Sequence, residues 1–180
     1  MILLGMILIS LYGIDLFSRQ QFIGSDKKAK IQNEAAYIAG HISKHLIQAI
    51  GDVVYPAVVI NPATGVTKTI LVTIDSTADG IKNYTNDANI SYCYNSTGCN
   101  NTAVPYAVYY NPNISSAAPP PGELLANHVL SLSANLTGNC VNLTVVTCWD
   151  PSQSLKACGT MDNPSFSMNT TIRMPSVSAQ

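Results

Sequence analysis

Hydrophobic and polar positions follow a helical period over the first part of the chain. Residues 1–17 carry no charge before Asp15, and from residue 18 onward the apolar residues recur three or four positions apart. That spacing places side chains on one face of a helix. The positions concerned are Ile31, Ala35, Ile38, Ile42, Leu46 and Ala49. We therefore predict one helix over residues 2–50, whose head-packing face is formed by Ile31, Ile38, Ile42 and Leu46.

This predicted helix is long for so small a chain. At 1.5 Å per residue it would measure roughly 70 Å, more than a small domain can cover, so one end is expected to project. The Gly24-Ser25-Asp26 step is a candidate kink, and Gly51 is a candidate C-terminal stop.

After Gly51 the pattern changes to short apolar or β-branched runs separated by Asn-Pro, Thr-Gly and Asp-Gly steps, which is typical of strands and turns. The runs are Val53–Ile60, Lys68–Asp75, Ile90–Tyr94, Ala107–Tyr110, stretches within Leu124–Leu136, Val141–Thr147 and Thr170–Met174. One helix followed by a series of strands predicts an α+β fold, with the helix packed on an antiparallel β-sheet head. The chain then divides into an apolar segment at 1–17, an amphipathic continuation at 18–51 and a β-rich head at 52–180.

The amino-acid composition excludes some classes of function and favours others. Only 11% of the residues are charged, against a globular average of about 25%. The formal net charge is −1, which gives no basic field to hold nucleic acid. Asn, Ser and Thr supply the polarity instead and include eight N-x-S/T sequons, at Asn83, Asn89, Asn95, Asn100, Asn113, Asn135, Asn142 and Asn169. Such a surface is typical of an extracytoplasmic β domain.

Five cysteines lie in the C-terminal half. No pair has the C-x-x-C spacing of a zinc ribbon or a thioredoxin-like site. In an oxidising compartment we expect two disulfides and one leftover thiol. Cys93 and Cys99 flank the turn residues 95–98 and form the natural first pair. One of Cys140, Cys148 and Cys158 is then unpaired, and the sequence leaves open which one.

The sequence contains few residues in patterns that indicate catalysis or metal binding. His41 and His45 have the i,i+4 spacing of metal ligands, but no third ligand is near them in the sequence, so solvent-facing polar residues are the better interpretation. Asp75, Asp79 and Asn83 resemble part of a calcium loop that lacks its closing glutamate. His128 has no evident nucleophile or acid partner. We therefore predict a protein that is not an enzyme and binds neither cofactor nor metal.

The first 17 residues allow two interpretations. They are shorter than the roughly 20 apolar residues of a full membrane span. No basic segment precedes them and no A-x-A site follows closely, unlike a standard signal peptide. They are either a single-pass membrane anchor, short or the remaining part of a longer one, or a buried core helix. Their terminal position and the charged segment that follows favour the anchor.

Several segments together resemble one family. The N-terminal helix resembles that of PilW-like minor pilins of type IV pili. The matching positions are, in order, Ser18-Arg19, Phe22, the step 31–34, Tyr37 and the run 42–49. Four later segments resemble strands of the same family, so the likeness covers most of the chain. They are Leu71–Gly80, Ile90–Tyr94, Leu124–Leu132 and Thr170–Met174. Such proteins begin with a basic leader, an aromatic and, five residues on, usually a glutamate, whereas Gly5 stands here. We therefore expect that this chain starts inside a longer one.

The resemblance implies a function. A minor pilin, or a pseudopilin of a type II secretion system, would sit in the inner membrane before assembly. It would then pack its N-terminal helix among other pilin subunits in a filament, pilus or periplasmic, and it would prime assembly or occupy the tip. The alternative from another class is a single-pass glycosylated surface module that binds a partner and never polymerises.

Overall fold

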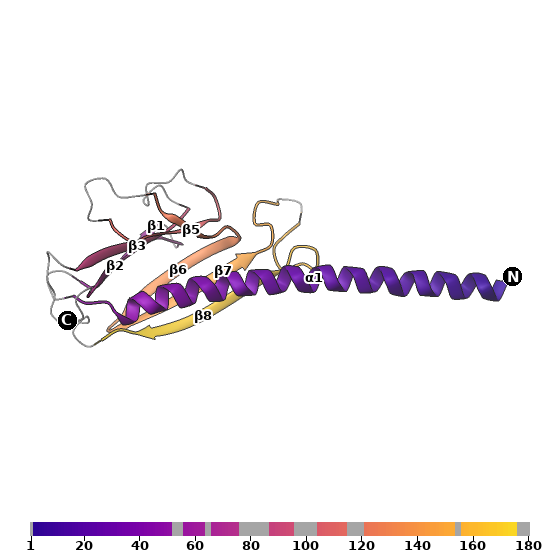
Figure 1. Cartoon of the computed structure of the whole chain (residues 1–180), viewed down its shortest axis with the longest axis horizontal. Helices are drawn as coiled ribbons and strands as arrows, with labels where there is room; N and C mark the ends of the chain where they lie inside the picture. The colour runs from indigo at the N-terminus through magenta and orange to yellow at the C-terminus, as the bar shows by residue number, and fades with distance from the viewer. Residues whose placement is uncertain are drawn as a thin grey trace.

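The computed structural model describes residues 2–51, 56–63, 66–75, 87–95, 104–114, 121–153 and 156–175 (Figure 1). One N-terminal helix, α1 (Ile2–Ile47), is followed by eight described strands. These are β1 (Val58–Ala63), β2 (Val66–Ile74), β3 (Ala88–Tyr94), β4 (Val108–Asn111), β5 (Glu123–Ala126), β6 (Val129–Thr137), β7 (Cys140–Cys148) and β8 (Ser165–Arg173). The fold is α+β, as predicted.

The helix runs for 46 residues and passes through Gly24 without a break, so the kink proposed there is not present. It ends at Ile47, where the backbone N–H groups of Gln48 and Ala49 donate to carbonyls three residues earlier. Such bonds tighten the last turn and satisfy carbonyls that would otherwise be unpaired. The chain then joins the head at once, because Ala49 forms a β-bridge with Ile74.

Gly51 has a different role from the predicted helix stop. A Cβ placed on Gly51 would lie 2.1 Å from the backbone nitrogen of Ala57 and 2.7 Å from its Cα. No real side chain tolerates such distances, so only glycine lets these two backbone segments pass each other here.

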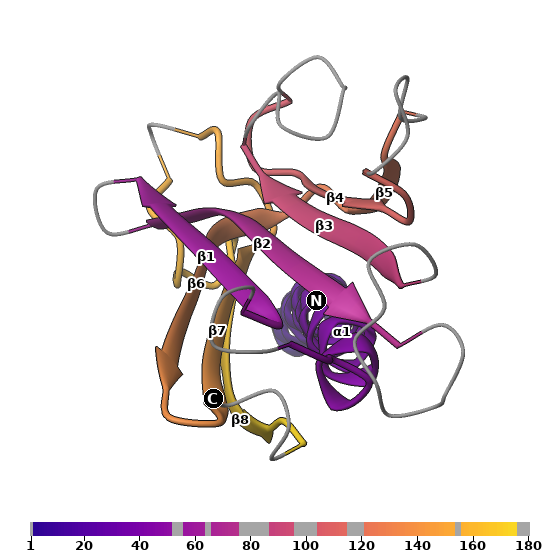
Figure 2. The ribbon, with the colours of Figure 1, turned by 90° about the vertical axis from the view of Figure 1, so that its left-hand side faces the viewer.

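The head contains two antiparallel sheets among the described residues. The first has the order β1-β2-β3-β4-β5 and the second the order β6-β7-β8. Viewed along the helix, the two sheets form an angle in which α1 lies (Figure 2). The helix contacts β7 and β8 most extensively and also contacts β2 and β5.

The core lies between the helix and both sheets. Ile31, Ile38, Ile42 and Leu46, the residues of the expected head-packing face, are each fully buried. Ile38, Ile42 and Leu46 belong to one core cluster with Val72 and Ile90 of the first sheet and Leu132, Leu143 and Val145 of the second. Thr147 of β7 adds a polar link, because its hydroxyl donates to the carbonyl of Ile31 at 3.0 Å.

Some strand predictions need correction. The segment 124–132, which resembles one strand of the pilin family, is divided between two strands, because Asn127 and His128 separate β5 from β6 and the two strands belong to different sheets. The last strand begins at Ser165, earlier than predicted. Residues 53–55 of the predicted run 53–60 lie outside the described part of the chain.

The expected single-pass inner-membrane anchor is wrong. Among the described residues, no helix combines the length and the apolar character that crossing a membrane requires. The uncharged part of α1 ends at Asp15, and Ser18, Arg19, Gln20 and Gln21 follow it.

Candidate functional site

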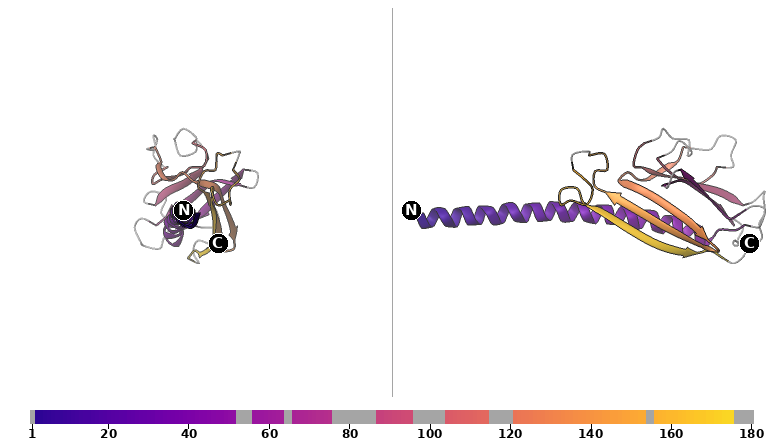
Figure 3. Two further views of the ribbon diagram at one scale, coloured as in Figure 1. Left: turned by 90° about the vertical axis from the view of Figure 1, so that its right-hand side faces the viewer. Right: turned by 180° about the vertical axis from the view of Figure 1, so that it is seen from behind.

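The first half of α1 projects from the head and contacts neither sheet (Figures 1 and 3). The large apolar side chains that the structure describes in this half each expose between 43% and 74% of their surface. They are Met6, Ile9, Leu11, Tyr12, Ile14, Leu16, Phe17, Phe22 and Ile23. Since successive residues turn by about 100° around a helix, these positions face every side of the axis rather than one stripe. A helix that is apolar all round is normally buried.

The charges of this projecting half neutralise each other. Arg19 Nε lies 3.0 Å from the carboxylate of Asp15, one helical turn away, and both side chains are largely exposed. Ser10, a polar residue of the same segment, donates its hydroxyl to the carbonyl of Met6. The exposed surface therefore presents apolar groups with little net charge.

A loop of the head holds α1 where the projecting half begins. This loop, residues 149–164 except 154–155, leaves β7 and returns to β8, and the Cys148–Cys158 disulfide closes its first part. Asn163 is buried and organises it: its amide donates to the carbonyls of Asp150 and Lys156 and accepts from the backbone of Asp150. The helix is attached by Lys27, whose Nζ donates to the carbonyl of Asp162 at 3.1 Å.

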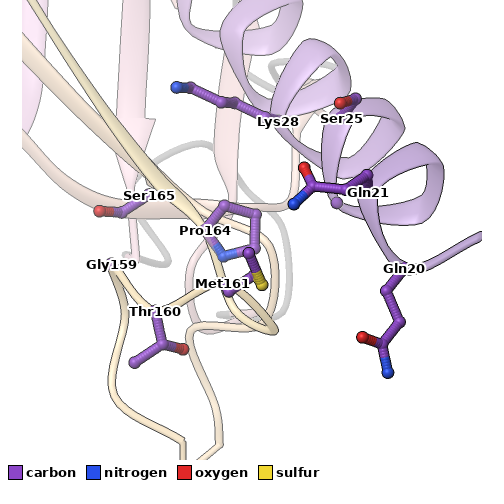
Figure 4. Close-up of a pocket in the computed structure, with 10 residues that line it drawn as sticks. Gln20, Gln21, Ser25, Lys28, Gly159, Thr160, Met161, Pro164 and Ser165 are labelled. Carbon is purple, nitrogen blue, oxygen red and sulfur yellow. The ribbon is translucent and has the colours of Figure 1, made fainter. Parts of the chain in front are cut away.

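A groove lies between this loop and the helix (Figure 4). From α1 it is lined by Gln20, Gln21, Gly24, Ser25 and Lys28, and from the loop side by Gly159, Thr160, Met161, Pro164 and Ser165. Met161 is 67% exposed there. The helix side of this groove is therefore polar apart from Gly24, and Met161 supplies an exposed apolar side chain on the loop side.

Next to the loop, Glu34 and His128 are hydrogen-bonded across the helix–sheet boundary. Nδ1 of His128 lies 2.9 Å from both carboxylate oxygens of Glu34, and both side chains are largely buried. The imidazole stacks on Trp149, with ring centroids 5.5 Å apart. Lys27 and Lys30 of α1 also lie over the indole ring, at 5.5 Å and 5.3 Å from its centroid. These contacts attach the helix to the loop and orient His128 as a packing residue.

A second polar cluster lies further along the helix. His41 and His45 direct their Nδ1 atoms at the hydroxyl of Tyr92 in β3, at 2.9 Å and 2.5 Å respectively. The same hydroxyl also lies 3.1 Å from the carbonyl of His41. Tyr110 of β4 covers both imidazoles, stacked on His45 and edge-on to His41. The two histidines therefore lie against the first sheet, and the expectation that they are solvent-facing is wrong, because His45 is buried and His41 is only half-exposed.

Burial shifts the pKa values in this cluster. Desolvation is the largest cause that lowers the pKa of His41, which Lys44 also lowers and Glu123 opposes. Desolvation likewise lowers the pKa of His45, with further contributions from His41 and Lys44. Desolvation raises the pKa of Tyr92, so its hydroxyl keeps its proton at any physiological pH.

The other candidate residues have mixed outcomes. The structure pairs Cys148 with Cys158 and leaves Cys140 as a free thiol among the cysteines it describes. Cys99, and with it the predicted Cys93–Cys99 bond, lies outside the described residues, as do Asp79 and Asn83 of the calcium candidate. Within the described ranges, no three His, Cys, Asp or Glu side chains gather as a metal site requires.

No protein-family model, no curated protein and no solved structure matches the chain.

Sequence reasoning missed the partners of all three histidines. Glu34 and His128 are 94 positions apart, and Tyr92 follows His45 by 47. Periodicity places a residue on a face but gives no register between a helix and a distant strand. The one available signal was that three histidines and a single tryptophan occur in a chain with few charges.

Proposed function

We propose that this chain is a non-enzymatic filament subunit of the type IV pilin class. Its projecting helix packs among the same helices of other copies, and its β head lies at the surface of the assembly. The observation that carries the proposal is the projecting part of α1, whose described apolar side chains from Met6 to Phe17 are exposed on every side of the helix axis.

Self-association is the simplest way to bury this surface. A single partner on one face would leave the opposite side of the helix in water, so several neighbours are needed. Copies of the same helix supply them, since their surfaces are uncharged from residue 2 to residue 14. When the contact between copies is head-to-tail and its rotation does not close, the result is an open helical filament. Parallel helices that are staggered along one axis would make a contact of this kind.

The continuous helix supports this arrangement. The residues that would join other copies and those that bury themselves in the head belong to the same element, Ile2–Ile47. Glu34, Lys27 and the disulfide-closed loop fix the head to the helix at the midpoint. A rigid subunit of this kind gives every head the same position relative to the helical core.

The sequence resemblance agrees with the proposal. Ser18-Arg19, Phe22 and Tyr37, which carry the likeness to minor pilins, belong to α1. A head without catalytic activity fits the same role, and His128 acts in it as a packing residue bonded to Glu34.

Deletion of residues 1–26 tests the proposal. Purified full-length chain and the shortened chain are compared by negative-stain electron microscopy and sedimentation velocity. We expect ordered filaments from the full chain and a folded monomer from the shortened one. Filaments that form equally well without residues 1–26, or a full chain that stays monomeric at high concentration, would refute the proposal.

A further inference from the structure

The cluster around Tyr92 has one hydroxyl for two imidazoles. Nδ1 of His41, Nδ1 of His45 and the carbonyl of His41 all lie within hydrogen-bond distance of the same oxygen. A hydroxyl donates one proton and accepts at two lone pairs. At least one imidazole must therefore carry its own proton on Nδ1, and the two rings share one hydrogen-bonding centre.

We propose that His41, His45 and Tyr92 form a pH-sensitive attachment between α1 and the five-stranded sheet. It is intact when both imidazoles are neutral and weakens when they become protonated. This inference concerns the fold of the head and does not depend on the proposed filament.

Charge, rather than the loss of hydrogen bonds, weakens the attachment. With both imidazoles protonated, each Nδ1–H can still donate to the oxygen of Tyr92, whose own proton can go to the carbonyl of His41. The rings are only 5.0 Å apart between centroids, however, and one of them is buried. Two like charges at that distance repel each other, and burial removes the water that would stabilise them.

The neighbouring groups do not cancel this repulsion. On α1 the cluster meets Lys44, which adds positive charge, and Tyr37, whose ring centroid lies 5.9 Å from that of His41. Tyr92 of β3 and Tyr110 of β4 are uncharged, since burial raises the pKa of both. Glu123 of β5 is the opposing group, and its effect on His41 is smaller than that of desolvation.

The direction of the pH effect follows from these pKa shifts. Both histidines have pKa values in the folded protein below the unfolded value of 6.5. The unfolded chain therefore binds protons more readily, and stability is fully present above that value. It is lost as the pH falls from about 6.5 toward the folded pKa values, by at most about tenfold in the folding equilibrium per pH unit for each histidine.

Urea unfolding of the full-length chain at pH 7.5 and at pH 5.0, followed by circular dichroism, tests the inference. The wild type should shift toward the unfolded state by about tenfold or more at the lower pH. The His41→Gln/His45→Gln variant should lose most of this shift. His128→Gln serves as the matched control, since His128 is bonded to Glu34 and not to Tyr92, and it should keep the shift.

A wild type whose stability does not change, or a double variant that keeps the full shift, would overturn the proposal. So would a His128→Gln variant that loses it. If the double variant does not fold, the proton NMR titration of the wild-type imidazoles decides. Values below 6.5 for both His41 and His45 support the attachment, and values at or above 6.5 contradict it.

Discussion

The carboxylate of Glu34 on α1 holds Nδ1 of His128 at 2.9 Å through both of its oxygens, across 94 residues of sequence. Because both side chains are largely buried, removing one leaves the other without its charged partner in a poorly hydrated site. Such a loss costs more than the loss of an ion pair in water.

Glu34→Gln should therefore destabilise the head by about 1–3 kcal/mol, measured by urea unfolding. Asp15→Asn is the matched control, because it removes the acid of the exposed pair with Arg19 and should change stability by less than about 0.5 kcal/mol. Equal effects of the two substitutions would show that Glu34 and His128 are not joined in the folded head.

Substitutions at Ile38 and Ile47 test whether α1 packs on the head as described. Ile38 is fully buried in the core, whereas Ile47, on the same helix, is 59% exposed. Ile38→Ala should cost about 2–5 kcal/mol because it leaves a cavity between the helix and the sheets. Ile47→Ala should stay within about 0.5 kcal/mol in the same thermal unfolding experiment. If Ile38→Ala leaves the midpoint unmoved, α1 does not pack on the head as described.

Replacing Gly51 and Gly40 by alanine should change the stability of the protein in opposite directions. Gly51→Ala places a Cβ against the backbone of Ala57 and should destabilise the head by about 1–3 kcal/mol. Gly40 lies on the exposed side of α1, and no atom lies within 4 Å of the position that an added methyl group would take. Gly40→Ala should therefore stabilise the protein by up to about 1 kcal/mol, since alanine favours the helix. Differential scanning calorimetry distinguishes the two, and a neutral Gly51→Ala would refute the close backbone approach.

The pairing of Cys148, Cys158 and Cys140 can be tested chemically. Non-reducing peptide mapping of oxidised protein should link Cys148 to Cys158 and find Cys140 alkylated. The double substitution to serine should cost roughly 2–3 kcal/mol, because it frees the loop in the unfolded chain. Cys140→Ser should have little effect. A Cys140–Cys148 or Cys140–Cys158 bond would contradict this, and the same map tests the predicted Cys93–Cys99 pair.

The sequence predicted the features that depend on the local spacing of apolar residues. The helix and its face at Ile31, Ile38, Ile42 and Leu46 follow from a spacing of three and four, which the helix itself imposes. It did not predict the division into two sheets, because the break at Asn127 and His128 depends on which distant strand each side bonds to. The predicted membrane anchor was wrong because no helix among the described residues is both long enough and apolar enough to cross a membrane.

The central claim is that copies of this chain associate through the projecting half of α1. Leu16 and Leu136 give a matched test, because they are 43% and 42% exposed on the helix and on the head respectively. Full-length Leu16→Asp and Leu136→Asp are compared with the wild type by high-speed pelleting and electron microscopy. We predict that Leu16→Asp abolishes filaments while Leu136→Asp preserves them. Filaments that survive Leu16→Asp but disappear in Leu136→Asp would place the assembly surface on the head and contradict the account.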